Sequence, residues 1–136
     1  MVNPIIGDKL RAFLEEPRHC VLATLNRDGS PQLTVMWYEL VGDIVVMNMT
    51  RGLVKDRNLR LDPRAAVCVE DGARFVTLSG RTELIEDRAV QEIEVNRLAI
   101  RYVGIRLAVS RWELIQGSDR IGIHLHVETM VAHGVD

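Results

Sequence analysis

The sequence predicts a mainly β, α+β domain in which roughly six antiparallel strands carry peripheral helices. Short apolar runs recur along the chain, and residues that favour turns separate them. The connections between the first three runs are short enough for an antiparallel meander, the beginning of a barrel. Helical periodicity is confined to a few segments of the chain. From the residues alone, a closed barrel and an open α+β sheet both remain possible.

Length and composition bound the class of protein. The 136 residues suit one domain, residues 1–136, with 47% apolar and 26% charged side chains. The net charge of −2 gives no reason to expect binding to nucleic acid or to an anionic membrane, so any anion site must be local. No apolar run is long enough to span a membrane, and the first residues carry Asp8, Glu15 and Glu16 instead of a signal peptide. We therefore expect a cytoplasmic protein.

The N-terminal segment predicts a helix followed by a buried strand. Asn3-Pro4 is a favourable helix start and Pro17 ends the helix. The apolar stripe of this helix consists of Ile6, Leu10, Phe13 and Leu14. From His19 to Leu25 the chain is largely apolar on both faces, which is typical of a buried central strand. A turn that contains Gly29 then leads to the return strand.

The return strand, Gln32–Leu40, alternates between two faces. Its two sets of side chains are Leu33, Val35 and Trp37 on one face, and Thr34, Met36 and Tyr38 on the other. After a short turn that contains Gly42, a third strand covers Ile44–Met49. These three strands on short turns form the predicted meander.

The stretch from residue 48 to residue 70 predicts a strand end, a short helix and another strand. Thr50 is the expected N-cap of the helix. Asp62-Pro63 is the expected stop, because the proline ring disfavours helical geometry at the residue before it. The helix has few apolar anchors, so its main feature is its charge pattern.

A basic stripe runs along this short helix. Arg51, Lys55 and Asn58 follow an i, i+4, i+7 spacing and would lie on one helical face. A strand that leads into a helix with cations in its first turns suits an anion such as phosphate, because free N–H groups, the helix dipole and cationic donors converge there. The alternative is that the stripe is simply a solvated face.

The second half of the chain predicts three more strands and a long helix. Two strands cover Ala65–Val69 and Arg74–Ile85, and Gly80 inside the longer one indicates a bulge at a barrel corner. Asp87 is the expected cap of a helix that continues to about residue 103. Ile121–Val131 is the last predicted strand.

Residues with obvious catalytic or metal-binding chemistry are scarce. No convincing catalytic triad, dinucleotide-binding fingerprint or strong metal motif is present, and no catalytic residue is assigned. His124 and His126 would share one face of the last strand, but a third ligand is not identifiable, so we expect a structural or surface role and no metal site. Cys20 and Cys68 lie in apolar runs and are expected to be reduced, buried thiols.

Three groups of motifs occur in a characteristic order and spacing. The central group is Thr50, Arg51, Lys55, Asn58-Leu59 and Asp62-Pro63-Arg64. The groups before and after it are Ala23-Thr24-Leu25, Asp28-Gly29, Pro31-Gln32-Leu33 and Leu78-Ser79-Gly80-Arg81. Together they resemble the split-barrel flavin-binding family typified by pyridoxamine 5′-phosphate oxidase, in particular its small branch associated with the deazaflavin coenzyme F420. The likeness covers about residues 6–85 and fades afterwards.

The resemblance implies a six-stranded antiparallel split β-barrel with peripheral helices, and a homodimer with its cofactor in the groove between subunits. By matching position, the cofactor phosphate would be bound by Lys55 and Arg51 with help from Thr50 and Asn58. The ring of the cofactor would be bordered by Gln32, Leu33, Thr34 and Val35, with Met49 below it. Met36 or Trp37 would face the substrate, and Arg57 and Arg60 are candidates for binding the acidic tail of F420.

Three functions are compatible with this resemblance. The leading one is an oxidoreductase that uses reduced F420 on a small conjugated substrate such as an enone, quinone or tetrapyrrole. The first alternative is an FMN-dependent oxidase or reductase of the same fold. The second is a non-catalytic protein that carries or stores a flavin, deazaflavin or haem. Pyridoxamine phosphate oxidation itself is disfavoured, because the C-terminal Arg/His substrate motif of that branch is not evident.

Overall fold

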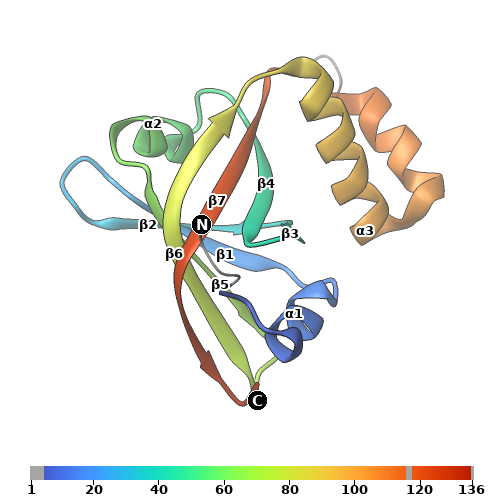
Figure 1. The fold of residues 1–136 in the computed structure, drawn as a ribbon. Helices are drawn as coiled ribbons and strands as arrows, with labels where there is room; N and C mark the ends of the chain where they lie inside the picture. Colours follow the sequence, from blue (N-terminus) through green and yellow to red (C-terminus); the bar gives the residue numbers. More distant parts are fainter. Residues whose placement is uncertain (1–4, 116–117, 136) are drawn as a thin grey trace.

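The computed structural model of the chain describes residues 5–115 and 118–135, with the backbone alone over residues 109–115. In chain order the elements are α1 (Asp8–Glu15), β1 (Cys20–Leu25), β2 (Pro31–Met36), β3 (Glu39–Val41), β4 (Ile44–Thr50), α2 (Val54–Leu61), β5 (Arg64–Glu70), β6 (Phe75–Ile85), α3 (Arg88–Ile115) and β7 (Arg120–His133) (Figure 1). Among these residues, no helix combines the length and the apolar character that a membrane span requires.

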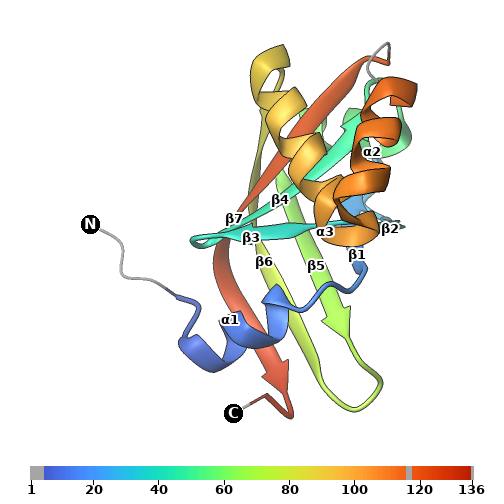
Figure 2. The same cartoon turned by 90° about the vertical axis from the view of Figure 1, so that its right-hand side faces the viewer.

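All the strands belong to one antiparallel sheet, in the order β2-β1-β5-β6-β7-β4-β3. The two edge strands, β2 and β3, are consecutive in the chain and are separated only by Trp37 and Tyr38. Three steps between neighbouring Cα atoms span at most about 11 Å, so the two edges of the sheet must lie close together. The sheet therefore curls round on itself (Figures 1 and 2), which is consistent with a split barrel.

Each of the six predicted strands is present, and the second is divided into β2 and β3, so the sheet has seven strands. The division falls at Trp37 and Tyr38, where side-chain hydrogen bonds replace strand pairing. The backbone N–H of Tyr38 donates to the hydroxyl of Tyr102 at 3.1 Å. That hydroxyl donates in turn to the carbonyl of Arg18 at 2.6 Å. The difference between six and seven strands therefore has a local cause.

The hydrophobic core fills the inside of the curled sheet. Its fully buried side chains include Leu22, Met47, Leu78, Ile123 and Leu125. α1 covers one end of this core with Phe13 and Leu14, both buried. The hydroxyl of Tyr38 donates to the carbonyl of Leu14 at 2.7 Å, so the end of α1 is also tied to the point where the second strand divides.

α1 begins later than the sequence predicts. The predicted start at Asn3-Pro4 lies outside the described residues, and the helix itself begins at Asp8. Before it, the backbone N–H groups of Ile5 and Ile6 donate to the carboxylate of Asp43 at 3.1 and 3.4 Å. These donors are therefore used by a side chain from the turn before β4 and not by a helical turn.

Local signals in the second half of the chain are confirmed. The register of β6 against β7 shifts between Ser79 and Gly80, and a Cβ atom on Gly80 would lie 1.9 Å from the carbonyl oxygen of His126. Asp87 caps α3, since its Oδ1 accepts the N–H of Val90 at 3.2 Å. At Gly104, with φ +83°, α3 breaks and turns back on itself beside the barrel (Figure 1).

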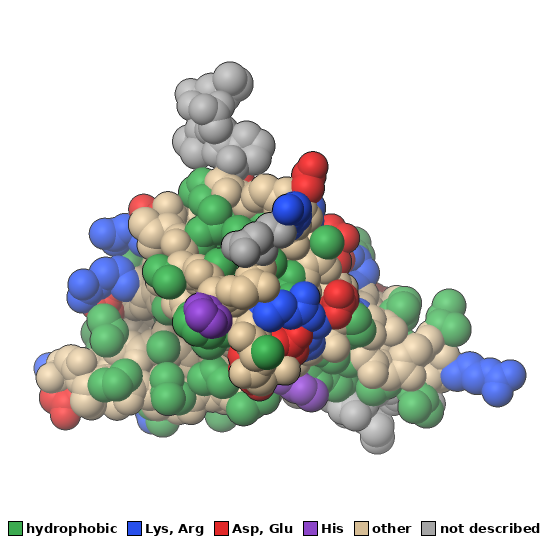
Figure 3. Space-filling view, turned by 90° about the horizontal axis from the view of Figure 1, so that it is seen from below, with side chains coloured by type: hydrophobic (Ala, Val, Ile, Leu, Met, Phe, Trp, Pro, Cys, Tyr) green, Lys and Arg blue, Asp and Glu red, His purple; other side chains and the backbone are tan. Residues whose placement is uncertain are grey.

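Charged side chains are mixed over the surface. On the face seen in Figure 3, Lys and Arg side chains lie close to Asp and Glu side chains, with hydrophobic side chains between them. This mixing accords with the net charge of −2. An anion site on this protein must therefore arise from a particular arrangement of cations.

Candidate cofactor site

The segment between β4 and α2 differs from its prediction at the helix start. Thr50 is the last residue of β4, and α2 begins only at Val54, after a turn in which Gly52 has φ +89°. The N–H of Gly52 donates to Oδ2 of Asp56 at 2.7 Å. Thr50 as N-cap was therefore wrong, because Asp56 binds the donor that precedes the helix. The predicted end of the helix before Asp62-Pro63 is confirmed.

The predicted stripe of Arg51, Lys55 and Asn58 is not present. Arg51 precedes α2 and forms ion pairs with carboxylates of Glu86 and Asp119, each at 2.7 Å. Asn58 is buried, and its amide nitrogen donates to two side-chain oxygens, Oγ1 of Thr24 at 3.1 Å and Oδ1 of Asn26 at 2.9 Å. Both of its amide hydrogens are thus used inside the protein.

Lys55 is a partly buried cation of this stretch and, like Arg57, has no counter-ion among the side chains that the structure describes. Arg60 forms ion pairs with the carboxylates of Asp56 at 2.7 Å and Glu86 at 3.1 Å. Lys55 itself makes no hydrogen bond or ion pair with the part of the chain that the structure describes. Burial lowers the pKa of Lys55, and the nearby positive charge of Arg120 lowers it further.

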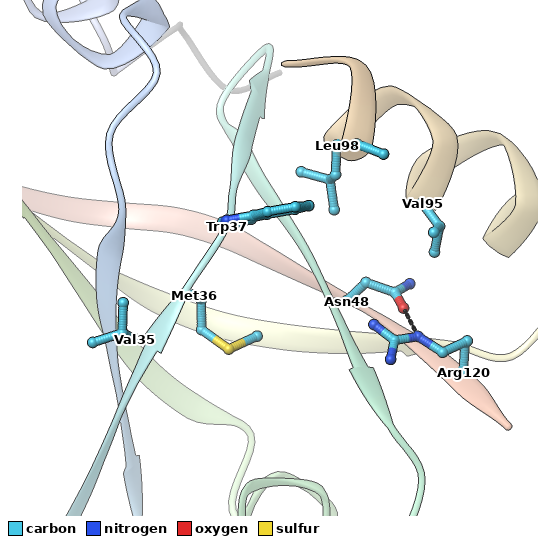
Figure 4. Close-up of a pocket in the computed structure, with 8 residues that line it drawn as sticks. Val35, Met36, Trp37, Asn48, Val95, Leu98 and Arg120 are labelled. Carbon is cyan, nitrogen blue, oxygen red and sulfur yellow. Dashed lines mark hydrogen bonds between the residues drawn. The ribbon is translucent and has the colours of Figure 1, made fainter. Parts of the chain in front are cut away.

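Arg120 is the second cation of the site. It begins β7, directly opposite Thr50 of β4. Its Nη1 donates to Oγ1 of Thr50 at 3.0 Å, and its Nε donates to Oδ1 of Asn48 at 2.8 Å (Figure 4). Among the side chains that the structure describes, those of residues 5–108 and 118–135, no carboxylate lies within ion-pair distance of Arg120, and burial lowers the pKa of its guanidinium. Arg120 bonded to a hydroxyl, with the half-buried cation Lys55 near it and no carboxylate paired with either among the described side chains, fits a phosphate group.

Arg120 also lines a pocket of about 310 Å³ between the strands and α3. The lining residues are Val35, Met36, Trp37, Asn48, Val95, Leu98, Ala99 and Arg120 (Figure 4). Its walls are mainly apolar, and its volume is within the range of about 300–1,000 Å³ for small-molecule sites. The ring of Trp37 is held by stacking on Tyr102, with 4.9 Å between the ring centres. Met36 and Trp37, the two candidates to face a substrate, both line this pocket.

Two of the β2 residues that are predicted to border the cofactor ring, Gln32 and Thr34, form hydrogen bonds with neighbouring side chains. Oε1 of Gln32 accepts from the hydroxyls of Thr24 and Thr34, each at 3.4 Å. The amide nitrogen of Gln32 is thus the end left for a ligand. Because Asn58 donates to Thr24 at 3.1 Å, α2 contributes to this arrangement through Thr24.

The outer face of β1 and β2 is apolar and exposed. Val21 of β1 pairs with Val35 of β2, and Ala23 pairs with Leu33. Leu33 and Val35 are each 64% exposed and Val21 is 37% exposed. β1 thus has a neighbouring strand on each side, but the predicted burial of both its faces is wrong, because the described residues leave its outer face exposed.

Three other predicted site residues have different surroundings. The side chain of Met49 is buried in the core, so only its backbone can border a ligand. Arg60 is engaged by two carboxylates, and Arg57 is exposed on α2. Arg57 thus remains available to an acidic ligand, whereas Arg60 is already paired.

The two histidines of β7 each face a glutamate. Nε2 of His124 lies 2.7 Å from Oε2 of Glu94 on α3, and Nε2 of His126 lies 3.2 Å from Oε1 of Glu83 on β6. Among the side chains of residues 5–108 and 118–135, no three from His, Cys, Asp or Glu come together as metal ligands would. Each contact connects β7 to a neighbouring element, α3 or β6, and is compatible with the structural role that we expect for the histidines.

The cysteines are free thiols, as the sequence predicts. Cys20 is buried with its sulfur 4.0 Å from that of Met47. Burial raises the pKa of the Cys20 thiol to about 12, which keeps it protonated and unreactive near neutral pH. Cys68 is only partly buried.

Arg120 and Asn48 were missed by the sequence analysis. Arg120 is a single cation at the start of an alternating strand, and Asn48 reads as an ordinary strand residue. Their relevance follows from the pairing of β4 with β7, which aligns Arg120 with Thr50 and Gly122 with Asn48. A weak signal was available: Asn48 and Thr50 are polar residues two apart on an otherwise apolar strand.

Known proteins of similar sequence and structure agree with this fold. Residues 6–129 match the family model described as pyridoxamine 5′-phosphate oxidase. A conserved hypothetical protein from Mycobacterium tuberculosis is similar with a TM-score of 0.81 and 24% identity, over 96% of this chain and 87% of that one. An F420 reductase is similar with a TM-score of 0.74 and 24% identity, over 93% and 98% of the two chains. The haem storage protein HutZ from Vibrio cholerae is similar with a TM-score of 0.73 and 16% identity, over 93% and 94%.

These structural similarities concern the fold, since one fold hosts many functions. The family binds flavin-type cofactors and includes oxidoreductases. Its model matches nearly the whole described chain, and the curled antiparallel sheet has the expected architecture. The chain belongs to the pyridoxamine 5′-phosphate oxidase family.

Proposed function

We propose that this protein is an oxidoreductase that binds F420 and uses it to reduce a small conjugated molecule. The observation that carries the proposal is the pair of half-buried cations, Lys55 and Arg120, which have no paired carboxylate among the described side chains, with Arg120 bonded to the hydroxyl of Thr50. A phosphate placed between them would accept charge-assisted hydrogen bonds from all three groups. It would also relieve the mutual repulsion of the two cations.

The remaining predicted site residues have supporting roles in this proposal. The charge of Arg51 is already balanced by Glu86 and Asp119, so we assign the second cation to Arg120. Asn58 acts through Thr24, which orients Gln32. The ring of the cofactor would lie along Gln32, Leu33, Thr34 and Val35 of β2, at the pocket lined by Trp37 and Arg120. When bound, the reduced deazaflavin supplies hydride from its C5 atom, and the protein orients it and excludes water.

We propose further that the protein is a homodimer. The apolar patch formed by Val21, Leu33 and Val35 supports this, because large side chains exposed on adjacent strands are stabilised when a second subunit covers them. β2 carries both the patch and the residues assigned to the ring. A second subunit on this face would therefore help to enclose the cofactor.

Titration with F420, FMN and haem under one set of conditions tests the function. We expect F420 to have the lowest dissociation constant, because exposed Arg57 on α2 offers a further cation to its acidic tail. A lower dissociation constant for FMN would favour an FMN-dependent enzyme of the same fold. Binding of F420 without turnover of any enone, quinone or tetrapyrrole acceptor would favour a carrier or storage protein.

A further inference from the structure

A row of three side chains connects α3 to the candidate phosphate site. Gln91, in the first turns of α3, is only 3% exposed. Its Nε2 donates to the carbonyl of Ile85 at 2.6 Å, and its Oε1 accepts from Nδ2 of Asn48 at 2.5 Å. Oδ1 of Asn48 then accepts from Nε of Arg120 at 2.8 Å. The row thus leads from a backbone carbonyl to the guanidinium of Arg120.

The direction of every hydrogen bond in this row is fixed by its two ends. The carbonyl of Ile85 can only accept, so it faces the amide nitrogen of Gln91 and leaves Oε1 of Gln91 towards Asn48. The guanidinium of Arg120 can only donate, so it requires the oxygen end of Asn48. If the side-chain amide of Asn48 were flipped, its nitrogen would face the guanidinium of Arg120, which has no atom that can accept a hydrogen bond. Gln91 therefore holds Asn48 in the orientation that Arg120 requires.

We propose that Gln91 is a positioning residue for the phosphate site. It holds Asn48 so that Arg120 is fixed against Asn48 and Thr50, with its remaining N–H groups directed to the anion. Because Gln91 belongs to α3, the seating of α3 on the sheet and the affinity for phosphate are coupled. This inference rests on the proposed function, since it assumes that Lys55 and Arg120 bind a phosphate.

The close approach of α3 to β7 makes this row possible. Gly122 of β7 lies opposite Asn48, and a Cβ atom there would come within 3.0 Å of Nε2 of Gln91 and 3.1 Å of Oε1 of Glu94. Glu94, one turn further along α3, contacts His124 on the same strand. Gln91 and Glu94 thus attach α3 to the sheet beside Gly122, but only Gln91 is linked to Arg120. Glu94 is therefore a matched control.

The experiment compares FMN with riboflavin, which differ only in the phosphate. Calorimetry at one ionic strength gives the ratio of the riboflavin to the FMN dissociation constant. We expect Gln91→Leu to lower this ratio about fivefold, the equivalent of one neutral hydrogen bond, with riboflavin affinity unchanged. Glu94→Gln, which alters the other attachment of α3, should keep the wild-type ratio.

Asn48→Ala provides a second variant at a partly exposed position, in case Gln91→Leu does not fold. It should lower the ratio at least as much as Gln91→Leu. In the Asn48→Ala background, Gln91→Leu should have no further effect on the ratio, because the connection to Arg120 is already broken. A purely structural role of Gln91 would instead lower the melting temperature and weaken both ligands equally.

The failures are distinguishable. If the wild-type protein binds FMN and riboflavin equally, the phosphate site itself is wrong, and the inference falls with it. If the wild-type protein prefers FMN but Gln91→Leu or Asn48→Ala keeps the wild-type ratio, the proposed phosphate site is supported and the positioning role of Gln91 is overturned. Equal weakening of both ligands by Gln91→Leu overturns it as well.

Discussion

Tyr102 of α3 binds the backbone of Tyr38 at the point where β2 ends and β3 begins. The hydroxyl of Tyr102 accepts the N–H of Tyr38 at 3.1 Å and lies 3.0 Å from the carbonyl oxygen of the same residue. Its ring stacks on Trp37 with an interplanar angle of 7°. The side chain of Tyr102 therefore bonds the backbone of Tyr38 at the point where strand pairing is interrupted. It also supports the ring of Trp37, which forms a wall of the pocket.

Tyr102→Phe should lower the stability of the protein. The ring and its stacking on Trp37 are retained, but the N–H of Tyr38 loses its acceptor in a largely buried place. We expect the free energy of unfolding to fall by about 1–3 kcal/mol, the cost of an unsatisfied buried polar group. Urea denaturation measures this change. An unchanged midpoint and slope would show that water replaces the hydroxyl.

Lys55→Ala should weaken the binding of FMN or F420 by about 10- to 100-fold, because the variant loses a charge-assisted hydrogen bond to phosphate. The loss should shrink at high salt. The melting temperature should hardly change, since Lys55 has no partner among the described residues and lies near the like charge of Arg120. Lys9→Ala, which removes an exposed lysine on α1, is the control. An unaltered dissociation constant in Lys55→Ala would support the solvated-face alternative.

The affinity for a phosphate-bearing ligand should fall at alkaline pH. Burial and the charge of Arg120 lower the pKa of Lys55 below its usual value of 10.5 in the folded protein. As the pH rises through this lowered pKa, Lys55 loses the proton that phosphate binding requires, so the FMN dissociation constant should rise. Riboflavin, measured at the same pH values, corrects for titration of the ring. Lys55→Arg should remove the dependence, because a guanidinium stays charged.

Leu33→Asp should dissociate the proposed dimer. Leu33 is 64% exposed beside Val21 and Val35, and a carboxylate buried there by a second subunit would have no partner. Light scattering at micromolar concentration should report a dimer for the wild-type protein and a monomer for the variant. Ile105→Asp, an equally apolar and exposed position on α3, should remain a dimer. A monomeric wild-type protein with cofactor bound would contradict the proposal.

Features that depend on neighbouring residues could be predicted from the sequence. Gly80 marked the bulge because only glycine fits against a carbonyl of the adjacent strand. Asp87 and Asp62-Pro63 marked helix ends through their own geometry. The N-cap at Thr50 failed because two residues could satisfy the same region of backbone, and Asp56 does so from inside the helix. Residue propensities alone do not decide whether Thr50 or Asp56 accepts this backbone hydrogen bond.

Features that depend on strand register could not be predicted in this way. Arg51 matched the family pattern and is nevertheless engaged by Glu86 and Asp119, which are distant in sequence. Arg120 lies outside the motif-bearing part of the chain, and only pairing across 70 residues brings it to Thr50. The candidate site therefore combines a local motif, centred on Lys55, with a partner that only the folded sheet supplies.

The pairing of β4 with β7 also bears on how the protein forms during synthesis. A ribosome that adds about 5–20 residues per second needs roughly 4–14 seconds for the 70 residues that separate Thr50 from Arg120. During this interval one edge of β4 has no neighbour in the nascent chain, and an unpaired edge invites association with other strands. Addition of β7 closes that edge and delivers the guanidinium of Arg120 in the same step. A nascent chain that is still open at β4 therefore has no complete phosphate site.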